Sequence, residues 1–183
     1  ISAEAPGSPD LFATTPLKKV SDLLRFDLRA NAFKWVKVMG QFTRREGREY
    51  YLQDDGAGLR FIPKTVPDIQ PGDELEVVGL PELGGPSPIL REALVHQTGH
   101  ASLPAPVPLS PRNMGQAGLD ATRVSIEGTL LNVNSVQAEQ VLEVQAGSRV
   151  FAGLMPAGSP SLRNIPVGSR LALTGVYASL EPN

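Results

Sequence analysis

The sequence of 183 residues contains no cysteine. This absence excludes disulfide bonds, metal sites built on thiolates and a cysteine nucleophile. It does not fix a compartment, because a protein outside the cytoplasm can also lack cysteine. Hydrophobic residues make up 41% and charged residues 20% of the chain, which is typical of globular proteins, so a packed core is expected.

An excess of either charge is also lacking. The chain has 17 Lys and Arg against 19 Asp and Glu, which gives a net charge of -2. The charges balance within residues 16–92 and again within residues 105–183, and the acidic excess comes from Glu4 and Asp10. Proteins that bind nucleic acid usually carry a basic footprint. The balance of charges therefore counts against nucleic acid as a partner, although the sequence still allows a local basic patch.

Long apolar runs and a leader for export are missing too. No run reaches the ~20 apolar residues that span a membrane, and no signal peptide is recognised. The chain starts at Ile1 rather than at Met, which favours an excised or processed chain. Residues 1–16 are rich in Pro, Ser, Ala and Gly, and they are predicted to form a flexible leader.

Catalytic motifs are absent from the sequence, which has no Ser-His-Asp arrangement, phosphate-binding loop or dinucleotide glycine motif. Asp54 and Asp55 are neighbours in one predicted turn, so turn chemistry is their expected role. His96 and His100 follow Glu92 at spacings of four, which would suit a metal ion on a helix. This segment follows a strand, however, and contains a glycine. We therefore predict no enzyme, no cofactor and no metal site.

The sequence does contain a series of short strands. A short helix is predicted first, within residues 17–30, where leucines recur at helical spacing. Alternating apolar residues, separated by Gly, Asp and Pro turns, then predict five strands. Residues 97–108, with one glycine and three prolines, are predicted to be a linker. The five predicted strands cover residues 33–42, 50–53, 59–62, 74–80 and 89–95.

After the linker the same pattern returns, which indicates an internal repeat. Residues 36–40 (VKVMG) match residues 124–128 (VSIEG), and residues 71–79 (PGDELEVVG) match residues 167–175 (VGSRLALTG). In both copies of the second stretch, the two glycines are seven positions apart. Weaker matches pair Ala57-Gly58 with Ala146-Gly147, and Arg60 with Arg149.

The second copy is shorter than the first, because only eight residues follow Gly175. We predict an all-β fold of two tandem five-stranded OB-type barrels, each preceded by a short helix. The second barrel is expected to lack its last strand, and its open edge would favour self-association. The predicted parts are a leader at 1–16, a first module at 17–96, a linker at 97–108 and a truncated second module at 109–183.

Three motifs of the first module resemble those of a known family: VxVxG at 36–40, YLQDDG at 51–56 and PGDxLxVxG at 71–79. With the joint at 99–106, they are similar to the tandem OB-like extracytoplasmic regions of bacterial membrane sensor proteins, of the sensor histidine kinase type. The resemblance covers about residues 17–178. It implies a sensory module outside the cytoplasm, tethered near a membrane in a parent protein, and it supplies no binding residues.

The repeat also predicts which side chains of the first module point outward. Val124 and Ile126 lie on one side of a strand with a period of two, and their equivalents Val36 and Val38 should be core. The opposite face of the first strands should then be exposed, as in the OB barrels that bind ligands there. The candidate ligand-binding residues are Trp35, Lys37, Met39, Arg44, Arg45, Arg48, Tyr51, Gln53 and Arg60.

Two interpretations of this face stay open. Trp35 and Tyr51 could stack on a base, a sugar or a peptide side chain, or the face packs on the helix or on the second module. The arginines could hold a phosphate or carboxylate, or they form a solvated hairpin tip neutralised by Glu46 and Glu49.

The expected function is a non-catalytic sensing or interaction module in the periplasm. Its expected partner is a small molecule, an oligosaccharide or a peptide. The first alternative is an OB protein that binds single-stranded nucleic acid, for which strongly salt-dependent binding is expected. The second alternative is a protein–protein interaction scaffold that acts through the open edge of the second barrel.

Overall fold

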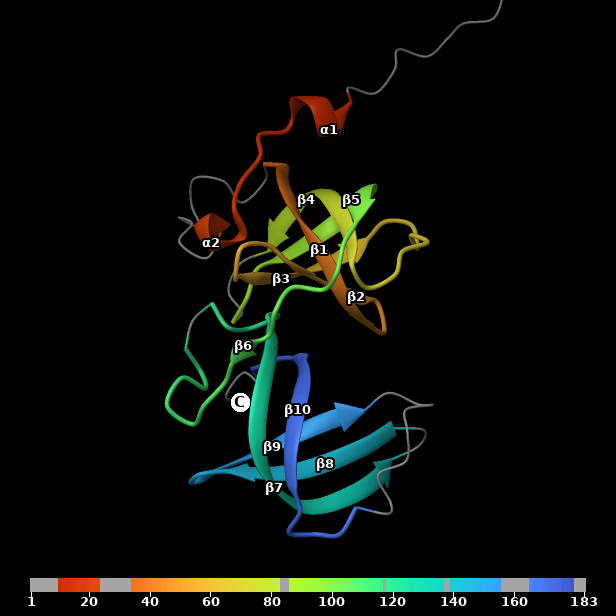
Figure 1. The fold of residues 1–183 in the computed structure, drawn as a ribbon. Helices are drawn as coiled ribbons and strands as arrows, with labels where there is room; N and C mark the ends of the chain where they lie inside the picture. The colour runs from red at the N-terminus through yellow and green to blue at the C-terminus, as the bar shows by residue number, and fades with distance from the viewer. Residues whose placement is uncertain are drawn as a thin grey trace, which may run out of the picture. The chain divides into compact units, whose positions relative to one another are not determined.

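The computed structural model of the chain describes residues 10–23, 34–82, 86–116, 118–136, 139–155 and 165–179. These residues are mostly β-structure and form two sheets (Figure 1). No helix in this part of the chain is long and apolar enough to cross a membrane. The chain divides into two compact units. Unit 1 comprises Ile1–Ala105, Ala117–Arg123 and Val176–Asn183, and unit 2 comprises Pro106–Gln116 and Val124–Gly175.

The sheet of unit 1 closes on itself as a barrel with the strand order β1-β2-β3-β5-β4. β3 and β5 pair in parallel, and the other neighbours pair antiparallel. A closed five-stranded barrel is the architecture of the OB fold, so the predicted all-β, OB-like class is confirmed. The strands are β1 (Val36–Glu46), β2 (Glu49–Gln53), β3 (Gly58–Pro63), β4 (Asp73–Glu82) and β5 (Ile89–His100).

Alternation along β1 positions the core of unit 1. Val36, Val38 and Phe42 are 3%, 0% and 3% exposed, as the period of two predicts. Gly40 lies on the same face, and a Cβ at this position would stand 2.6 Å from the carbonyl oxygen of Gln53. β1 can therefore cross β2 closely only because position 40 has no side chain. Further core residues are Leu52, Leu59, Phe61, Leu75, Val77 and Leu90.

The helix α1 (Leu11–Thr14) lies in the stretch that was predicted to be a flexible leader. Asp10 caps this helix, because its carboxylate accepts a hydrogen bond from the N–H of Phe12 at 3.0 Å. Leu17 then pairs with Lys37 of β1 through a parallel bridge. Residues 10–16 thus form a capped helix and its connection to the barrel, while residues 1–9 lie outside the described part.

The helix α2 (Val20–Leu23) covers only part of the helix predicted at 17–30. Val20 and Leu23 are 0% and 1% exposed and belong to the barrel core. The N–H of Val20 donates to Oδ2 of Asp54 at 2.8 Å, which ties the helix to the turn between β2 and β3. Residues 24–33 of the prediction, including the start of the first predicted strand, lie outside the described residues.

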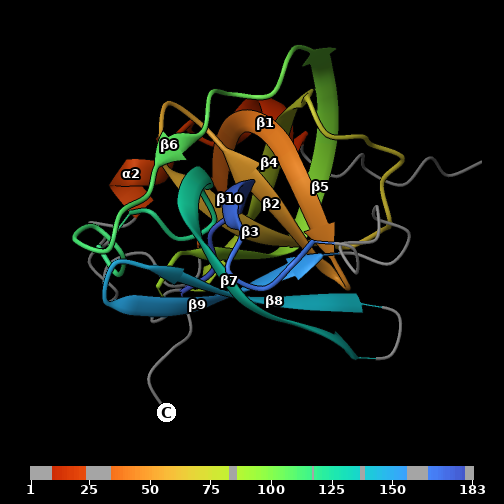
Figure 2. The ribbon, with the colours of Figure 1, turned by 60° about the horizontal axis from the view of Figure 1, so that its bottom comes forward.

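The sheet of unit 2 is open. Its strand order is β10-β7-β8-β9, and β6 pairs in parallel with β7 (Figure 2). No described strand lies between β9 and β10, which is the place that β5 takes between β3 and β4 in unit 1. The strands are β6 (Val107–Pro108), β7 (Arg123–Val136), β8 (Glu139–Ala146), β9 (Arg149–Met155) and β10 (Arg170–Val176).

The same backbone hydrogen bond is found within each unit, at positions that the repeat pairs with one another. The N–H of Gly72 donates to the carbonyl of Phe42 at 2.8 Å, and the N–H of Gly168 donates to the carbonyl of Leu130 at 2.8 Å. β1 and β7 each carry a bulge directly after the accepting residue. Strands β7 to β10 therefore correspond to β1 to β4.

One part of the alignment between the two copies of the repeat is wrong. Gly58 lies inside β3, whereas Gly147 lies in the turn before β9 and has a φ of +59°. The register of the two ladders makes Val150 the equivalent of Gly58, so Arg60 and Arg149 do not correspond. The cause is a turn between β8 and β9 that is shorter than the turn between β2 and β3.

The predicted linker at 97–108 contains strand residues at both ends. β5 continues to His100, which pairs with Asp73 of β4. β6 begins at Val107 and pairs with β7. Residues 101–106 lie between these strands, so half of the predicted linker is strand.

Candidate functional site

The β1–β2 hairpin carries three arginines near its tip. Arg44 and Arg45 lie at the end of β1, and Arg48 follows the turn residue Gly47, whose φ of +56° favours glycine. Nε of Arg45 donates to the carbonyl of Gly47 at 2.9 Å, and its guanidinium lies 5.1 Å from the centre of the Tyr50 ring. These contacts hold Arg45 in place, while Arg48 is exposed beside it.

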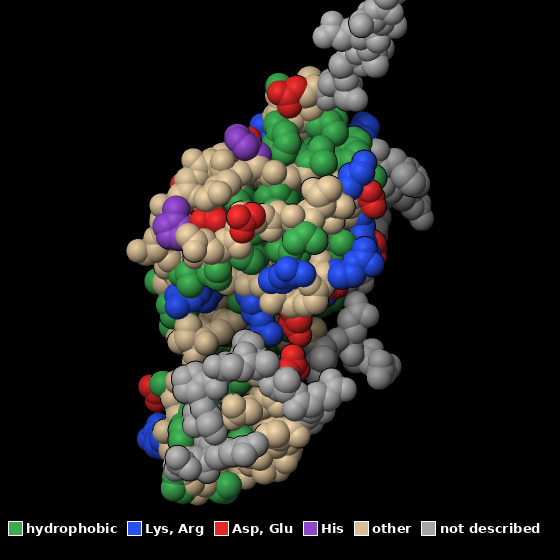
Figure 3. Space-filling view, turned by 90° about the vertical axis from the view of Figure 1, so that its right-hand side faces the viewer, with side chains coloured by type: hydrophobic (Ala, Val, Ile, Leu, Met, Phe, Trp, Pro, Cys, Tyr) green, Lys and Arg blue, Asp and Glu red, His purple; other side chains and the backbone are tan. Residues whose placement is uncertain are grey.

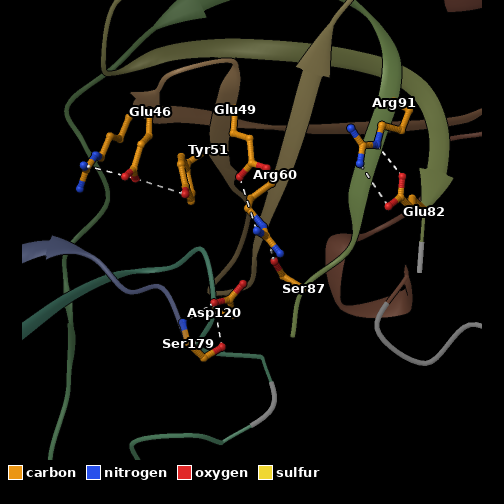
Figure 4. A network of polar contacts seen from close by, with 10 residues as sticks. Glu46, Glu49, Tyr51, Arg60, Glu82, Ser87, Arg91, Asp120 and Ser179 are labelled. Atoms are coloured by element: carbon orange, nitrogen blue, oxygen red, sulfur yellow. Dashed lines mark hydrogen bonds and ion pairs between the residues drawn. The ribbon is translucent and has the colours of Figure 1, made fainter. Parts of the chain in front are cut away.

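Two arginines of unit 1 form ion pairs with glutamates of β1 and β2 (Figure 4). Nη2 of Arg44 lies 3.3 Å from Oε2 of Glu46, and Nη1 of Arg60 on β3 lies 3.4 Å from Oε2 of Glu49. Nε of Arg60 also donates to the hydroxyl of the buried Ser87 at 3.3 Å. Ion pairs near the surface contribute only about 0–1 kcal/mol to stability, so these arginines can change partner at small cost.

Tyr51 lies beneath this network. The residue is 5% exposed, and its hydroxyl donates to Oε2 of Glu46 at 3.5 Å. Burial raises the pKa of the Tyr51 hydroxyl, and the negative charges of Glu46 and Glu49 add to the shift. The hydroxyl therefore stays protonated at neutral pH and acts as a donor. The expectation that Tyr51 presents an open ring for stacking is wrong.

Gln53 is covered by a segment from the second half of the sequence. The residue is 4% exposed, and its Oε1 accepts a hydrogen bond from the N–H of Arg123 at 2.8 Å. Across the β2–β3 ladder, a Cβ on Gly58 would stand 2.2 Å from the carbonyl carbon of Ala121. Residues 120–123 therefore lie directly on this part of the sheet, where position 58 leaves room for them. The expectation that Gln53 is exposed is wrong.

The covering segment is itself anchored within unit 1. The backbone of Tyr177 is hydrogen-bonded to Ala121 at 2.8 Å and to Thr122 at 2.9 Å. Oδ1 of Asp120 accepts hydrogen bonds from the N–H and the hydroxyl of Ser179 at 2.7 and 2.9 Å (Figure 4). Ala121 and Thr122 are fully buried. This part of the predicted ligand face is thus a packing surface, covered by residues that the prediction assigned to the second module.

Trp35, Lys37 and Met39 lie on another part of the barrel, next to β4 and α1. Nζ of Lys37 donates to the carbonyl of Phe12 at 2.7 Å and lies 3.8 Å from Oε1 of Glu76. Met39 is 43% exposed and Trp35 is half-buried. The nine candidate residues therefore do not share one face. Arg44 and Tyr51 both contact Glu46, whereas Arg60 pairs separately with Glu49.

The two histidines do not gather into a metal site. His96 and His100 lie on a strand, so the helical spacing with Glu92 does not apply. Nδ1 of His96 lies 3.6 Å from Glu76, and Nδ1 of His100 lies 2.8 Å from Asp73. Each ring thus has a different carboxylate neighbour. Within the described ranges, no group of three or more His, Asp and Glu side chains could hold a metal ion.

A further charged pair near the hairpin was missed by the sequence analysis. The guanidinium of Arg91 at the start of β5 is hydrogen-bonded to the carboxylate of Glu82 at the end of β4 (Figure 4). The connection between these strands also contains Ser87, the partner of Arg60. Opposite charges at the facing ends of two predicted strands are the signal that could have found the pair. On the face that Figure 3 shows, unit 1 carries both basic and acidic side chains.

Comparisons with known proteins identify no family. No family model matches the chain, and no curated protein matches it. The resemblance to extracytoplasmic sensor regions therefore stays a prediction, and so does the expected location outside the cytoplasm.

Several solved structures are similar to the chain at low identity. The HINa domain of Ifi202 in complex with a 20-bp double-stranded DNA is 7% identical, with 71% of this chain and 78% of that chain covered and a TM-score of 0.37. A murine DNA-binding protein bound with double-stranded DNA is 7% identical, with 80% and 98% covered and a TM-score of 0.32. A protein from Leishmania major Friedlin, described as a candidate aspartyl-tRNA synthetase, is 13% identical, with 57% and 25% covered and a TM-score of 0.39.

At such scores the likeness assigns no function to this chain, which spans only a quarter of the length of the Leishmania protein. It does contradict one expectation. The balanced charge was taken to count against nucleic acid as a partner, yet the similar structures include proteins bound to DNA. A net charge near zero averages over the whole chain and says nothing of one hairpin, so nucleic acid cannot be set aside on that ground.

Proposed function

We propose that unit 1 is a non-catalytic OB module that binds nucleic acid through the arginines of its β1–β2 hairpin and of β3. The observation that carries the proposal is the position of Arg44, Arg45, Arg48 and Arg60 on the barrel. OB folds bind oligonucleotides on the face of strands two and three and through the loop between strands one and two. Arg48 lies in this loop and Arg60 lies on β3, while Arg44 and Arg45 lie at the end of β1 beside the loop.

The local charge supports this proposal better than the total charge does. Four arginines stand against two glutamates, Glu46 and Glu49, on the same elements. Among the described residues, Arg45 and Arg48 make no ion pair, and both are exposed. A guanidinium without a carboxylate partner is a ready donor for a phosphate oxygen. These two arginines are therefore the first contacts that we assign to nucleic acid.

Unit 2 is proposed to be a second OB-type module that takes no part in this binding. Its β7–β8 hairpin corresponds to the β1–β2 hairpin of unit 1. Residues 131–145, which form that hairpin, contain no lysine or arginine and two glutamates. The hairpin of the second module therefore offers phosphate no cationic side chain.

The test is binding of labelled oligonucleotides of about 16 nucleotides, the upper end of the site size of one OB fold, measured by fluorescence anisotropy. The full chain should bind at low salt, and its affinity should fall as salt is added, because binding releases counterions from the phosphates. Arg45→Gln combined with Arg48→Gln should weaken binding about tenfold. The double variant should also reduce the salt slope by about one for each phosphate that the chain no longer binds.

The matched control is Arg112→Gln combined with Arg170→Gln, which removes the same charge from exposed side chains of unit 2. This control variant should bind as the unchanged chain does. The proposal fails if the unchanged chain shows no saturable binding at low salt, or if both double variants lose affinity equally. An unaltered emission spectrum of Trp35, the single tryptophan, would show that unit 1 of each variant is folded.

A further inference from the structure

We infer that the site on unit 1 recognises the sugar–phosphate backbone of nucleic acid and does not read its bases. This inference rests on the proposed function and defines the ligand of the same site. It follows from the distribution of side chains around the hairpin arginines. The groups that could read a base are buried and already bonded, whereas the groups that hold a phosphate lie at the surface.

Stacking on bases requires an open aromatic ring, and the site has none. OB folds that bind single strands without sequence preference usually stack successive bases on aromatic side chains. Here Tyr51 is the aromatic residue nearest to the paired arginines, and it is 5% exposed, with its hydroxyl on Glu46. Tyr50 on the same strand is 2% exposed and packs in the barrel core between Phe42 and Phe61.

In the rest of the described chain no aromatic side chain is fully exposed, and the half-buried Trp35 lies on another part of the barrel. The large hydrophobic side chains that are exposed there are all aliphatic, Met39 among them, and none is aromatic. A base laid over the hairpin would therefore meet arginine and glutamate side chains rather than a ring. Without a ring, little of the affinity can come from stacking.

The neutral polar groups that could read the edges of bases are also used within the protein. Gln53 would be the amide of choice for a base edge, but its Oε1 accepts the N–H of Arg123 and the residue is 4% exposed. The hydroxyl of Thr43 donates to the carbonyl of Tyr51 at 3.2 Å. The buried Ser87 hydroxyl accepts from Arg60. These side chains would have to break internal hydrogen bonds before they could contact a base.

The arginines and their glutamates are what remains at the surface. A guanidinium binds a phosphate in the same forked geometry in which it binds a carboxylate, so Arg44 and Arg60 can exchange Glu46 and Glu49 for phosphates. The glutamates repel the incoming phosphate by their charge, whatever base it carries. Removing that charge with Glu46→Gln and Glu49→Gln should therefore strengthen binding by the same factor for every base sequence.

The experiment compares ligands of equal length and phosphate number, with the full chain and anisotropy as the readout. The probes are an oligomer of abasic deoxyribose phosphates, oligo-dT, oligo-dA and a mixed sequence. Backbone recognition predicts dissociation constants within about threefold of one another and the same salt slope for all four, because the salt slope counts phosphate contacts.

The outcomes separate this inference from the function on which it rests. If the base-bearing strands bind and the abasic oligomer is weaker by about tenfold or more, as expected when even one base stacks, the inference is overturned and the proposed function stands. A spread of that size among the three base sequences would also overturn it. If no probe binds at low salt, the proposed function itself fails.

Discussion

The two units make the same turn before β4 and before β10, with Gly72 and Gly168 at corresponding positions, but only unit 1 closes its sheet in the described part of the chain. In unit 1, β5 lies between β3 and β4, whereas in the described part of unit 2 no strand joins β9 to β10. Burial differs in the same way. Leu75 on β4 is 0% exposed, while its equivalent on β10, Leu171, is only partly buried.

This difference shows that the direction in which side chains point and the extent to which they are buried have separate causes. Alternation decides which face of a strand is apolar, and it does so in both units. Closure of the sheet into a barrel decides how completely that apolar face is buried. Among the described residues of unit 2, the buried core cluster consists of Leu130, Leu142 and Val144, whereas the core cluster of unit 1 draws on all five strands. Because burial contributes about 25 cal/mol per Å² of apolar surface, the same side chain stabilises the closed barrel more.

The largest effect is expected from truncating the equivalent leucines. Leu75→Ala removes a fully buried side chain and should lower the free energy of unfolding of unit 1 by about 2–5 kcal/mol. Leu171→Ala removes a partly buried side chain and should cost about half as much or less. Urea unfolding followed by Trp35 emission reports on unit 1, and hydrogen exchange in β10 reports on unit 2. Equal losses at the two positions would contradict the difference in closure.

A smaller effect is expected from exchanging residues at one equivalent position. Gly58→Val should destabilise unit 1 by about 1–3 kcal/mol, because a Cβ at this position already stands 2.2 Å from the carbonyl group of Ala121. The reverse change, Val150→Gly, affects a residue that is 59% exposed and should cost less than about 1 kcal/mol.

Hydrogen exchange locates this effect. The amide N–H groups of Ala121 and Thr122 should exchange faster in Gly58→Val, since the segment is pushed off β3. They should be unchanged in Val150→Gly, which serves as the matched control. Unaltered protection of both amides in Gly58→Val would show that the segment is not packed on Gly58.

The smallest effect is expected on the pH dependence of stability, which should differ between the two units. The carboxylate of Asp73 accepts the N–H of Gln70 at 2.8 Å and contacts His100. These hydrogen bonds, the first above all, hold the pKa of the Asp73 carboxyl below its ordinary value. A carboxyl with a lowered pKa stabilises the fold above its ordinary pKa, and this contribution is lost as the pH falls through the lowered value. In unit 2, Ser169 takes the equivalent position and cannot contribute in this way.

Unit 1 should therefore lose stability on acidification at this site, and Asp73→Asn should flatten that dependence. Urea unfolding followed by Trp35 emission, repeated from about pH 6 to about pH 2 around the ordinary carboxyl pKa, measures the slope. Ser169→Ala in unit 2 is the control and should leave the slope unchanged. If Asp73→Asn has the same slope as the unchanged chain, other carboxyls cause the acid dependence.

The strands of both units could be predicted because they depend on local sequence. Alternation in residues 36–42 identified the inward side chains of β1, and the glycine spacing identified the repeat. The alignment failed between β2 and β3, where Gly58 was paired with Gly147. A turn can change length without changing the strands that it joins, so spacing between motifs is a weak guide to register at that point.

The candidate site could be predicted only in part. The arginines of the hairpin were found, because a turn between two strands lies at the surface. The exposure of Tyr51 and Gln53 was predicted wrongly. Alternation along a strand shows which side chains point away from the barrel core, but it does not show which other segments of the chain cover them. The residue that covers Gln53 is Arg123, 70 positions away. No local pattern contains that contact.

The anchoring of residues 120–123 has a consequence for how the protein is made. The barrel of unit 1 is complete in sequence at His100, but its cover is held by Tyr177 and Ser179. A ribosome that adds about 5–20 residues per second therefore needs roughly 4–16 s between finishing the barrel and supplying the anchor. During that interval the segment that covers Gln53 and Gly58 lacks its hydrogen bonds to Tyr177 and Ser179.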